Sequence, residues 1–127
     1  MKAYEIQTNL DALQSLAEEI TKWAHEKGFW PEHGVATLTI ETRVALINME
    51  KTQKIMLVVT ELAELTEGLR KAADSSTAGF TNEEEEVADA IIRLLDYAGR
   101  YRLRIGDALG AKMTKNEGRP YQHGKRF

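Results

Sequence analysis

Three stretches of this 127-residue chain carry apolar residues at the spacing of an α-helix. The clearest covers about 52–71, where the apolar side chains fall in one sector about 120° wide at 100° per residue. They are expected to form the core face of this helix: Ile55, Val58, Val59, Leu62, Leu65 and Leu69. Similar periodicity runs over about 9–27 and 83–106. The pattern predicts an all-α chain, in which a short loop makes the last two long helices antiparallel.

Capping residues predict where these helices begin and end. Thr8 or Asn9 is placed to cap the first helix, and Gly28 to end it. Thr81 or Asn82 is placed to cap the third helix.

The remaining segments give weaker signals. Small polar residues over 74–82 predict a loop. The segment 35–50 is ambiguous between strand and helix. The tail, about 107–127, contains Gly118, Pro120 and Gly124 and is expected to be mostly irregular.

The composition is that of one soluble globular domain spanning 1–127. An apolar fraction of 43% with 29% charged residues argues against disorder. The absence of cysteine excludes disulfides and zinc–thiolate sites. The opening residues lack the apolar core of a signal peptide, and no run approaches transmembrane length. We therefore expect a cytoplasmic protein without a membrane partner.

The charge is divided unevenly along the chain. Residues 1–99 carry 9 Lys and Arg against 18 Asp and Glu, whereas residues 100–127 carry 8 against 2. The basic tail could hold phosphates, with arginine as a bidentate clamp and lysine as a point charge. Basic residues without interleaved aromatic groups are a weak nucleic-acid footprint, so no nucleic acid is expected.

Two acidic pairs lie on the second and third helical stretches. Glu61 and Glu64 are three residues apart, as are Glu86 and Asp89, so each pair presents two carboxylates on one side of its helix. Facing pairs would form a four-carboxylate pocket suited to Mg²⁺, with Mn²⁺ as a substitute. Each pair alone is also compatible with an ordinary solvated helix face.

A di-iron carboxylate bundle is the competing metal site on facing helices. It requires Glu-x-x-His on two helices. The three histidines, His25, His33 and His123, have no glutamate three residues before them. Carboxylate-only ligation therefore favours magnesium or manganese.

With these residues in view, the chain resembles the MazG-like family of all-α nucleoside triphosphate pyrophosphohydrolases. The resemblance covers HEKGFW, IMLVVTELAELTEGLRK, EEEEVADAIIRLLDYAGRY and KMTKNEGRPYQHGKRF, more than half of the chain. The family signature has two adjacent glutamates, a third after two spacers, then Glu-x-x-Asp on the next helix. Thr60 stands where the first glutamate is expected, and Glu67, one turn on, could partly substitute.

The resemblance implies an antiparallel bundle completed by oligomerisation, as a homodimer or homotetramer. It also implies Mg²⁺-dependent cleavage of a nucleoside triphosphate to a monophosphate and pyrophosphate. The metal ligands would be Glu61, Glu64, Glu86 and Asp89, with Glu61 or Glu64 as the catalytic base. The implied substrate contacts are Lys112, Asn116, Arg119 and Lys125 in the tail. Asp96 and Trp30 are further candidate substrate contacts; Trp30 follows a turn and could form a wall of a base pocket or serve structural packing.

Two other functions are compatible with the same residues. The chain could bind Mg²⁺ or a nucleotide without turnover, with Thr60 marking lost chemistry. It could also be a helical interaction protein with solvated acidic faces.

Overall fold

The computed structural model describes residues 3–30 and 37–120. In this part of the chain there are four helices and no strand, which confirms the all-α prediction. The helices are α1 (Ala3–Glu26), α2 (Ile40–Lys71), α3 (Asn82–Arg100) and α4 (Ile105–Glu117).

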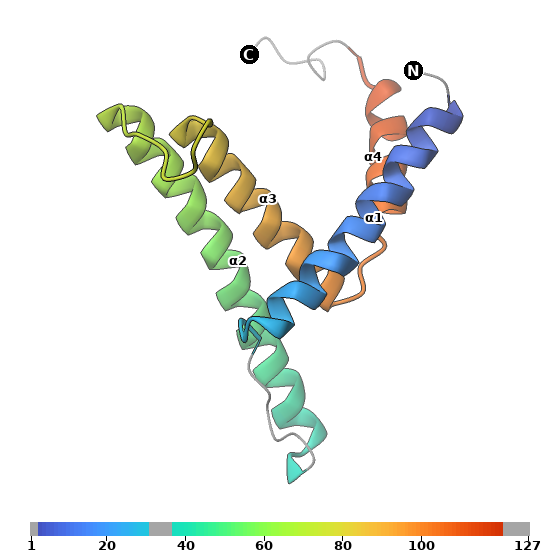
Figure 1. Ribbon diagram of the computed structural model, residues 1–127. Coiled ribbons are helices and arrows are strands. Elements are labelled where there is room, and N and C mark those ends of the chain that lie inside the picture. Colours follow the sequence, from blue (N-terminus) through green and yellow to red (C-terminus); the bar gives the residue numbers. More distant parts are fainter. Residues whose placement is uncertain (1–2, 31–36, 121–127) are drawn as a thin grey trace.

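The helices form two arms that spread apart as a V (Figure 1). One arm is the antiparallel hairpin of α2 and α3; in the other, α4 runs back along α1. The arms are joined where α1 packs on α3. The single chain therefore contains helical hairpins, but its four helices do not close into one bundle.

The loop that closes the α2/α3 hairpin is held by side chains of α3. Thr81 caps α3 in a capping box with Glu84, as the sequence predicted for Thr81. The carboxylate of Glu85 accepts hydrogen bonds from the hydroxyl groups of Ser75, Ser76 and Thr77 and from the Ser76 amide. These bonds lower the pKa of Glu85 to about 2. They tie the loop to α3 and so set the register of α3 against α2.

The predicted starts of the first two helices are wrong, whereas the predicted end of the first is right. α1 begins at Ala3, so Thr8 and Asn9 lie inside the helix and do not cap it. α2 begins at Ile40, after an N-cap by Thr39, so most of the ambiguous 35–50 segment is helical. Gly28 does end the first helix, with a φ of 77° that favours glycine.

The tail is also more regular than predicted. The third predicted stretch breaks after Arg100, where Arg102 adopts a φ of 52° and the Leu103 amide donates to the Ala98 carbonyl. The helix α4 follows, over residues assigned to an irregular tail. It is supported by α1: Gly106 is buried, and a Cβ there would lie 2.6 Å from the Leu10 carbonyl oxygen.

The core of the chain lies where α1 crosses α3. Ala17, Leu95 and Ala98 are buried there. The backbones approach closely, since a Cβ on Gly99 would lie 2.3 Å from the Ala17 carbonyl oxygen. This small-residue contact fixes the angle at which α1 meets the hairpin.

The predicted core face of α2 is mostly exposed, which corrects the sequence prediction. Only Val58 of that face is buried. Four other residues of that face have exposed fractions between 40% and 59%: Ile55, Val59, Leu62 and Leu69. On α3, Val87, Ile91 and Leu94 are exposed in the same way. No helix in the described part of the chain has the length and apolarity needed to cross a membrane.

Candidate functional site

Three carboxylates from α2 and α3 meet across the hairpin. One oxygen from each of Glu61, Glu86 and Asp89 lies within 4.8 Å of the others. Glu61 is buried, Glu86 is half-buried and Asp89 is exposed. The antiparallel hairpin thus brings together one residue of the first acidic pair and both of the second. We call Glu61, Glu86 and Asp89 the carboxylate triad.

Glu64, the fourth predicted ligand, lies just outside the carboxylate triad. Its side chain is exposed, and its oxygens are not among the three gathered within 4.8 Å. It is nevertheless near, because its charge is one of the causes that raise the pKa of Glu86.

The negative charge of the carboxylate triad is only partly offset by the chain. Burial, followed by the charge of Glu64, raises the pKa of Glu86, although Asn82 donates a hydrogen bond to its Oε1 at 3.2 Å. Burial, followed by the charge of Glu61, also raises the pKa of Asp89. The Glu86 Oε2 atom is buried and has no hydrogen-bond partner among the described residues. Buried polar atoms are normally paired, so this oxygen has an accepting position that the described residues leave open to a water molecule or a cation.

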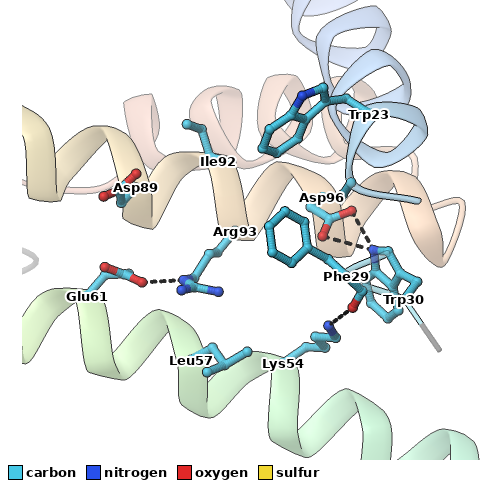
Figure 2. A pocket seen from close by; sticks show the side chains of 11 residues that line it. Trp23, Phe29, Trp30, Lys54, Leu57, Glu61, Asp89, Ile92, Arg93 and Asp96 are labelled. Carbon is cyan, nitrogen blue, oxygen red and sulfur yellow. Dashed lines mark hydrogen bonds and ion pairs between the residues drawn. The ribbon is translucent and has the colours of Figure 1, made fainter. Parts of the chain in front are cut away.

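One cation from the chain does reach the carboxylate triad. The Arg93 guanidinium donates through Nε to the Glu61 carboxylate in an ion pair between α3 and α2 (Figure 2). Arg93 was not among the site residues predicted from the sequence. Its spacing of four residues from Asp89 was the available signal, since i and i+4 share one side of a helix.

A pocket of about 250 Å³ opens beside the carboxylate triad. Its aromatic side chains come from the end of α1 and the turn after it, and α2 and α3 supply the charged ones. The residues that line it are Trp23, Ala24, Phe29, Trp30, Lys54, Leu57, Glu61, Asp89, Ile92, Arg93 and Asp96 (Figure 2). Because it includes Glu61 and Asp89, the pocket and the carboxylate triad form one continuous site.

Trp30 and Asp96, both predicted to contact substrate, bind each other inside this pocket. The Trp30 indole N–H donates to both Asp96 carboxylate oxygens, at 2.9 and 3.0 Å, and the Thr21 hydroxyl donates to the same carboxylate at 2.7 Å. Trp30 is buried, with the Lys54 ammonium 4.2 Å from its ring centroid. Lys54 also donates to the Phe29 carbonyl at 2.6 Å. These contacts hold the turn after α1 against both helices of the hairpin.

The accessible aromatic rings of the pocket are Trp23 and Phe29, which the sequence analysis did not select. Their side chains are about half exposed, and their ring centroids are 5.8 Å apart. Both lie in or near the HEKGFW block that carries part of the family resemblance. Helical periodicity could not identify Phe29, because this residue follows the end of α1.

The tail residues lie elsewhere in the single chain. Lys112 and Asn116 are exposed on α4, and Arg119 follows just beyond its end. α4 packs on α1, in the arm that diverges from the α2/α3 hairpin (Figure 1). The single chain therefore does not bring these residues to the carboxylate triad. Lys125 lies outside the described residues.

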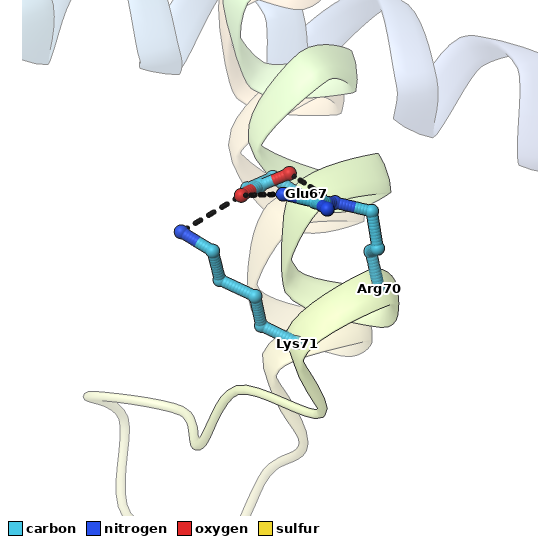
Figure 3. A network of polar contacts seen from close by, with 3 residues as sticks. All are labelled: Glu67, Arg70 and Lys71. Carbon is cyan, nitrogen blue, oxygen red and sulfur yellow. Dashed lines mark hydrogen bonds and ion pairs between the residues drawn. The ribbon is translucent and has the colours of Figure 1, made fainter.

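Thr60, which stands in place of a signature glutamate, and Glu67, its suggested partial substitute, are engaged away from the carboxylate triad. Thr60 is exposed and donates its hydroxyl to the Met56 carbonyl. Glu67 forms ion pairs with Arg70 and Lys71, at 2.8 and 2.7 Å, on the surface of α2 (Figure 3). Neither supplies an oxygen to the triad in this structure.

No family model matches the chain, and neither the curated proteins nor the solved structures contain a match.

The residues of the site fit a divalent cation with a preference for oxygen. Carboxylates on two rigid helices supply only oxygen donors, which suit Mg²⁺ and Mn²⁺. The unpaired Glu86 Oε2 and the raised pKa values of Glu86 and Asp89 show that a cation here would relieve repulsion.

Proposed function

We propose that this protein is a Mg²⁺-dependent pyrophosphohydrolase of the MazG-like type, which converts a nucleoside triphosphate to a monophosphate and pyrophosphate. The observation that carries the proposal is the carboxylate triad at the edge of an aromatic pocket. Phosphoryl chemistry needs a metal-holding carboxylate set beside a place for the rest of the nucleotide. The carboxylate triad and the adjoining pocket are the candidates for these two parts.

The acidic residues of the site would bind the metal and accept the proton of the attacking water. Glu61, Glu86 and Asp89 would hold Mg²⁺, with Mn²⁺ as a substitute, and Glu64 would complete the set from its exposed position nearby. When bound, the metal would neutralise phosphate charge and lower the pKa of a water molecule. Of the two predicted bases, Glu64 is favoured to take the proton of the attacking water, because Glu61 is buried within the triad that would hold the metal, whereas Glu64 is exposed beside it.

The aromatic pocket would receive the base of the nucleotide. Trp23 and Phe29 offer accessible ring faces, and base–aromatic stacking tolerates different bases. The Asp96 carboxylate would act mainly through Trp30, because it accepts the Trp30 and Thr21 hydrogen bonds. In this arrangement Trp30 is the buried wall of the pocket.

A second copy of the chain would complete the site. The apolar side chains exposed along α2 and α3 form the kind of helix face that a partner hairpin covers in a four-helix bundle. Lys112, Asn116, Arg119 and Lys125 would then hold the β and γ phosphates from a neighbouring subunit of a homodimer or homotetramer. A partner is needed in this scheme because α4 diverges from the α2/α3 hairpin.

The test is a panel of ribo- and deoxyribonucleoside triphosphates incubated with the protein, with Mg²⁺ and then with chelator. Monophosphate and pyrophosphate, lost on chelation, are the expected products. Glu64→Gln should abolish turnover, whereas Glu67→Gln, which alters a surface glutamate of the same helix, should not. Diphosphate and orthophosphate would contradict the proposed position of cleavage.

The second hypothesis, a module that binds Mg²⁺ and nucleotide without turnover, has one observation in its favour. Thr60 replaces a signature glutamate and its hydroxyl is used within α2. Metal-dependent nucleotide binding with no product from any triphosphate would select this alternative.

A further inference from the structure

We propose that Arg93 is an exchangeable counter-ion of the metal site. In the metal-free protein its guanidinium neutralises Glu61, and when a divalent cation occupies the carboxylate triad it transfers to the phosphates of the nucleotide. The proposal rests on the function proposed above and assigns a role in it to a residue outside the family signature.

The first argument is the position of Arg93. It lies one turn after Asp89 on α3 and crosses to α2, where it binds the buried Glu61 carboxylate (Figure 2). Arg93 also lines the aromatic pocket. It therefore stands at the junction between the carboxylates that would hold metal and the space that would hold the nucleotide.

The second argument is the unused capacity of the guanidinium. The group has five N–H donors, and only Nε contacts Glu61. Among the residues that the structure describes, no second acceptor binds it, and its side chain is 40% exposed. A planar fork with free donors facing a pocket is suited to bidentate binding of phosphate.

The third argument is electrostatic. A guanidinium does not lose its proton at any ordinary pH, so it cannot relax by deprotonation when a divalent cation approaches Glu61. Its positive charge must either oppose the cation or move away. The approach of a polyphosphate gives it an alternative anionic partner next to its present one. Metal binding and nucleotide binding should therefore both move the Arg93 guanidinium away from Glu61 and towards the nucleotide phosphates.

The experiment measures binding by calorimetry in the wild-type protein, Arg93→Gln and Arg93→Lys. Arg70→Gln is the matched control. Arg70 is likewise paired with a glutamate of α2, Glu67, but this pair is exposed on the surface of the helix (Figure 3). The first titrant is Mn²⁺ alone. The second is a nucleoside triphosphate analogue with a methylene group between the α and β phosphorus atoms, titrated at saturating Mn²⁺.

Opposite changes are expected for the two titrants. Arg93→Gln should bind Mn²⁺ more tightly by roughly tenfold, because a competing charge at a partly hydrated site has been removed. The same variant should bind the analogue more weakly by roughly tenfold or more. Arg93→Lys should keep wild-type Mn²⁺ affinity but lose part of the analogue affinity, because an ammonium lacks the fork. Arg70→Gln should change neither.

Unchanged or weaker Mn²⁺ binding in a folded Arg93→Gln protein would overturn the proposal, as would unchanged binding of the analogue. Thermal unfolding in chelator establishes whether each variant is folded. If the wild-type protein hydrolyses triphosphates while Arg93→Gln retains both affinities, only the counter-ion role is refuted. If the wild type hydrolyses nothing but the two affinities change in opposite directions, the proposed reaction fails and the counter-ion role is supported.

Discussion

Replacing Glu86 by glutamine should stabilise the metal-free protein and at the same time remove most of its response to Mg²⁺. The carboxylate is half-buried, has one oxygen without a partner and lies within 4.8 Å of the other members of the carboxylate triad. Glutamine keeps the shape and retains a carbonyl that can accept the Asn82 hydrogen bond. The substitution therefore removes little except charge.

The size of the effect follows from the separation of the charges. Two unit charges 4.8 Å apart repel by about 1 kcal/mol in water and by about 3 kcal/mol at the effective dielectric of a protein surface. Arg93 already offsets part of this at Glu61, so a net gain of about 1–2 kcal/mol is expected. For a domain of this size, that corresponds to a rise in Tm of about 4–8 °C.

The assay is thermal unfolding at neutral pH, first in chelator and then in Mg²⁺. At a concentration of one hundred times its Kd, Mg²⁺ should stabilise the wild type by about 2.7 kcal/mol. Glu86→Gln should start from a higher Tm and gain little from Mg²⁺. Glu83→Gln is the control, because it removes an exposed carboxylate of the same helix outside the triad. A lower Tm for Glu86→Gln in chelator, or a full response to Mg²⁺, would refute the electrostatic argument.

Three further predictions concern stability and assembly. The folded protein raises the pKa values of Glu86 and Asp89 above their ordinary 4.5 and 3.8. The protonated carboxyl groups therefore contribute stability below pH 4.5 and 3.8, and this stability is lost as the pH rises through the folded-state pKa values. The Tm advantage of Glu86→Gln in chelator should therefore grow as the pH rises from about 4 to neutral; a gap independent of pH would contradict this. Gly99→Ala should lower the free energy of unfolding by about 1–3 kcal/mol in urea titrations, because the new Cβ would lie 2.3 Å from the Ala17 carbonyl oxygen; an unchanged midpoint would show that α1 can shift freely. Leu62→Asp should shift sedimentation to the monomer if the exposed face of α2 is the subunit interface, and an unchanged oligomer would place the interface elsewhere.

Local features of the sequence determined much of the helical structure. The 3.6-residue periodicity identified the central parts of α1, α2 and α3, because it reflects which side of a helix is apolar. Thr81 could be recognised as a cap because the capping box is formed by residues close together in sequence. The i,i+3 spacing of the acidic pairs likewise put each pair on one side of its helix, which led to three members of the site.

Only the tertiary structure decided which apolar residues are buried in the chain. Val58 and Leu62 belong to the same periodic stripe, yet Val58 is buried and Leu62 is exposed. Periodicity marks an apolar face but does not say whether another part of the chain covers it. Similarly, α4 has a weak apolar pattern, and its helix is supported by the close approach of Gly106 to α1.

The details of the site also depended on contacts between residues distant in sequence. The Arg93–Glu61 ion pair joins residues on two helices, and the aromatic pocket forms because the turn after α1 folds onto the hairpin. The sequence by itself determined that the carboxylates would lie on helices, since spacing along a helix is a local property. Which carboxylates meet, which cation they meet and which rings stand beside them were decided by packing, because helix register and crossing angle arise only when the helices touch.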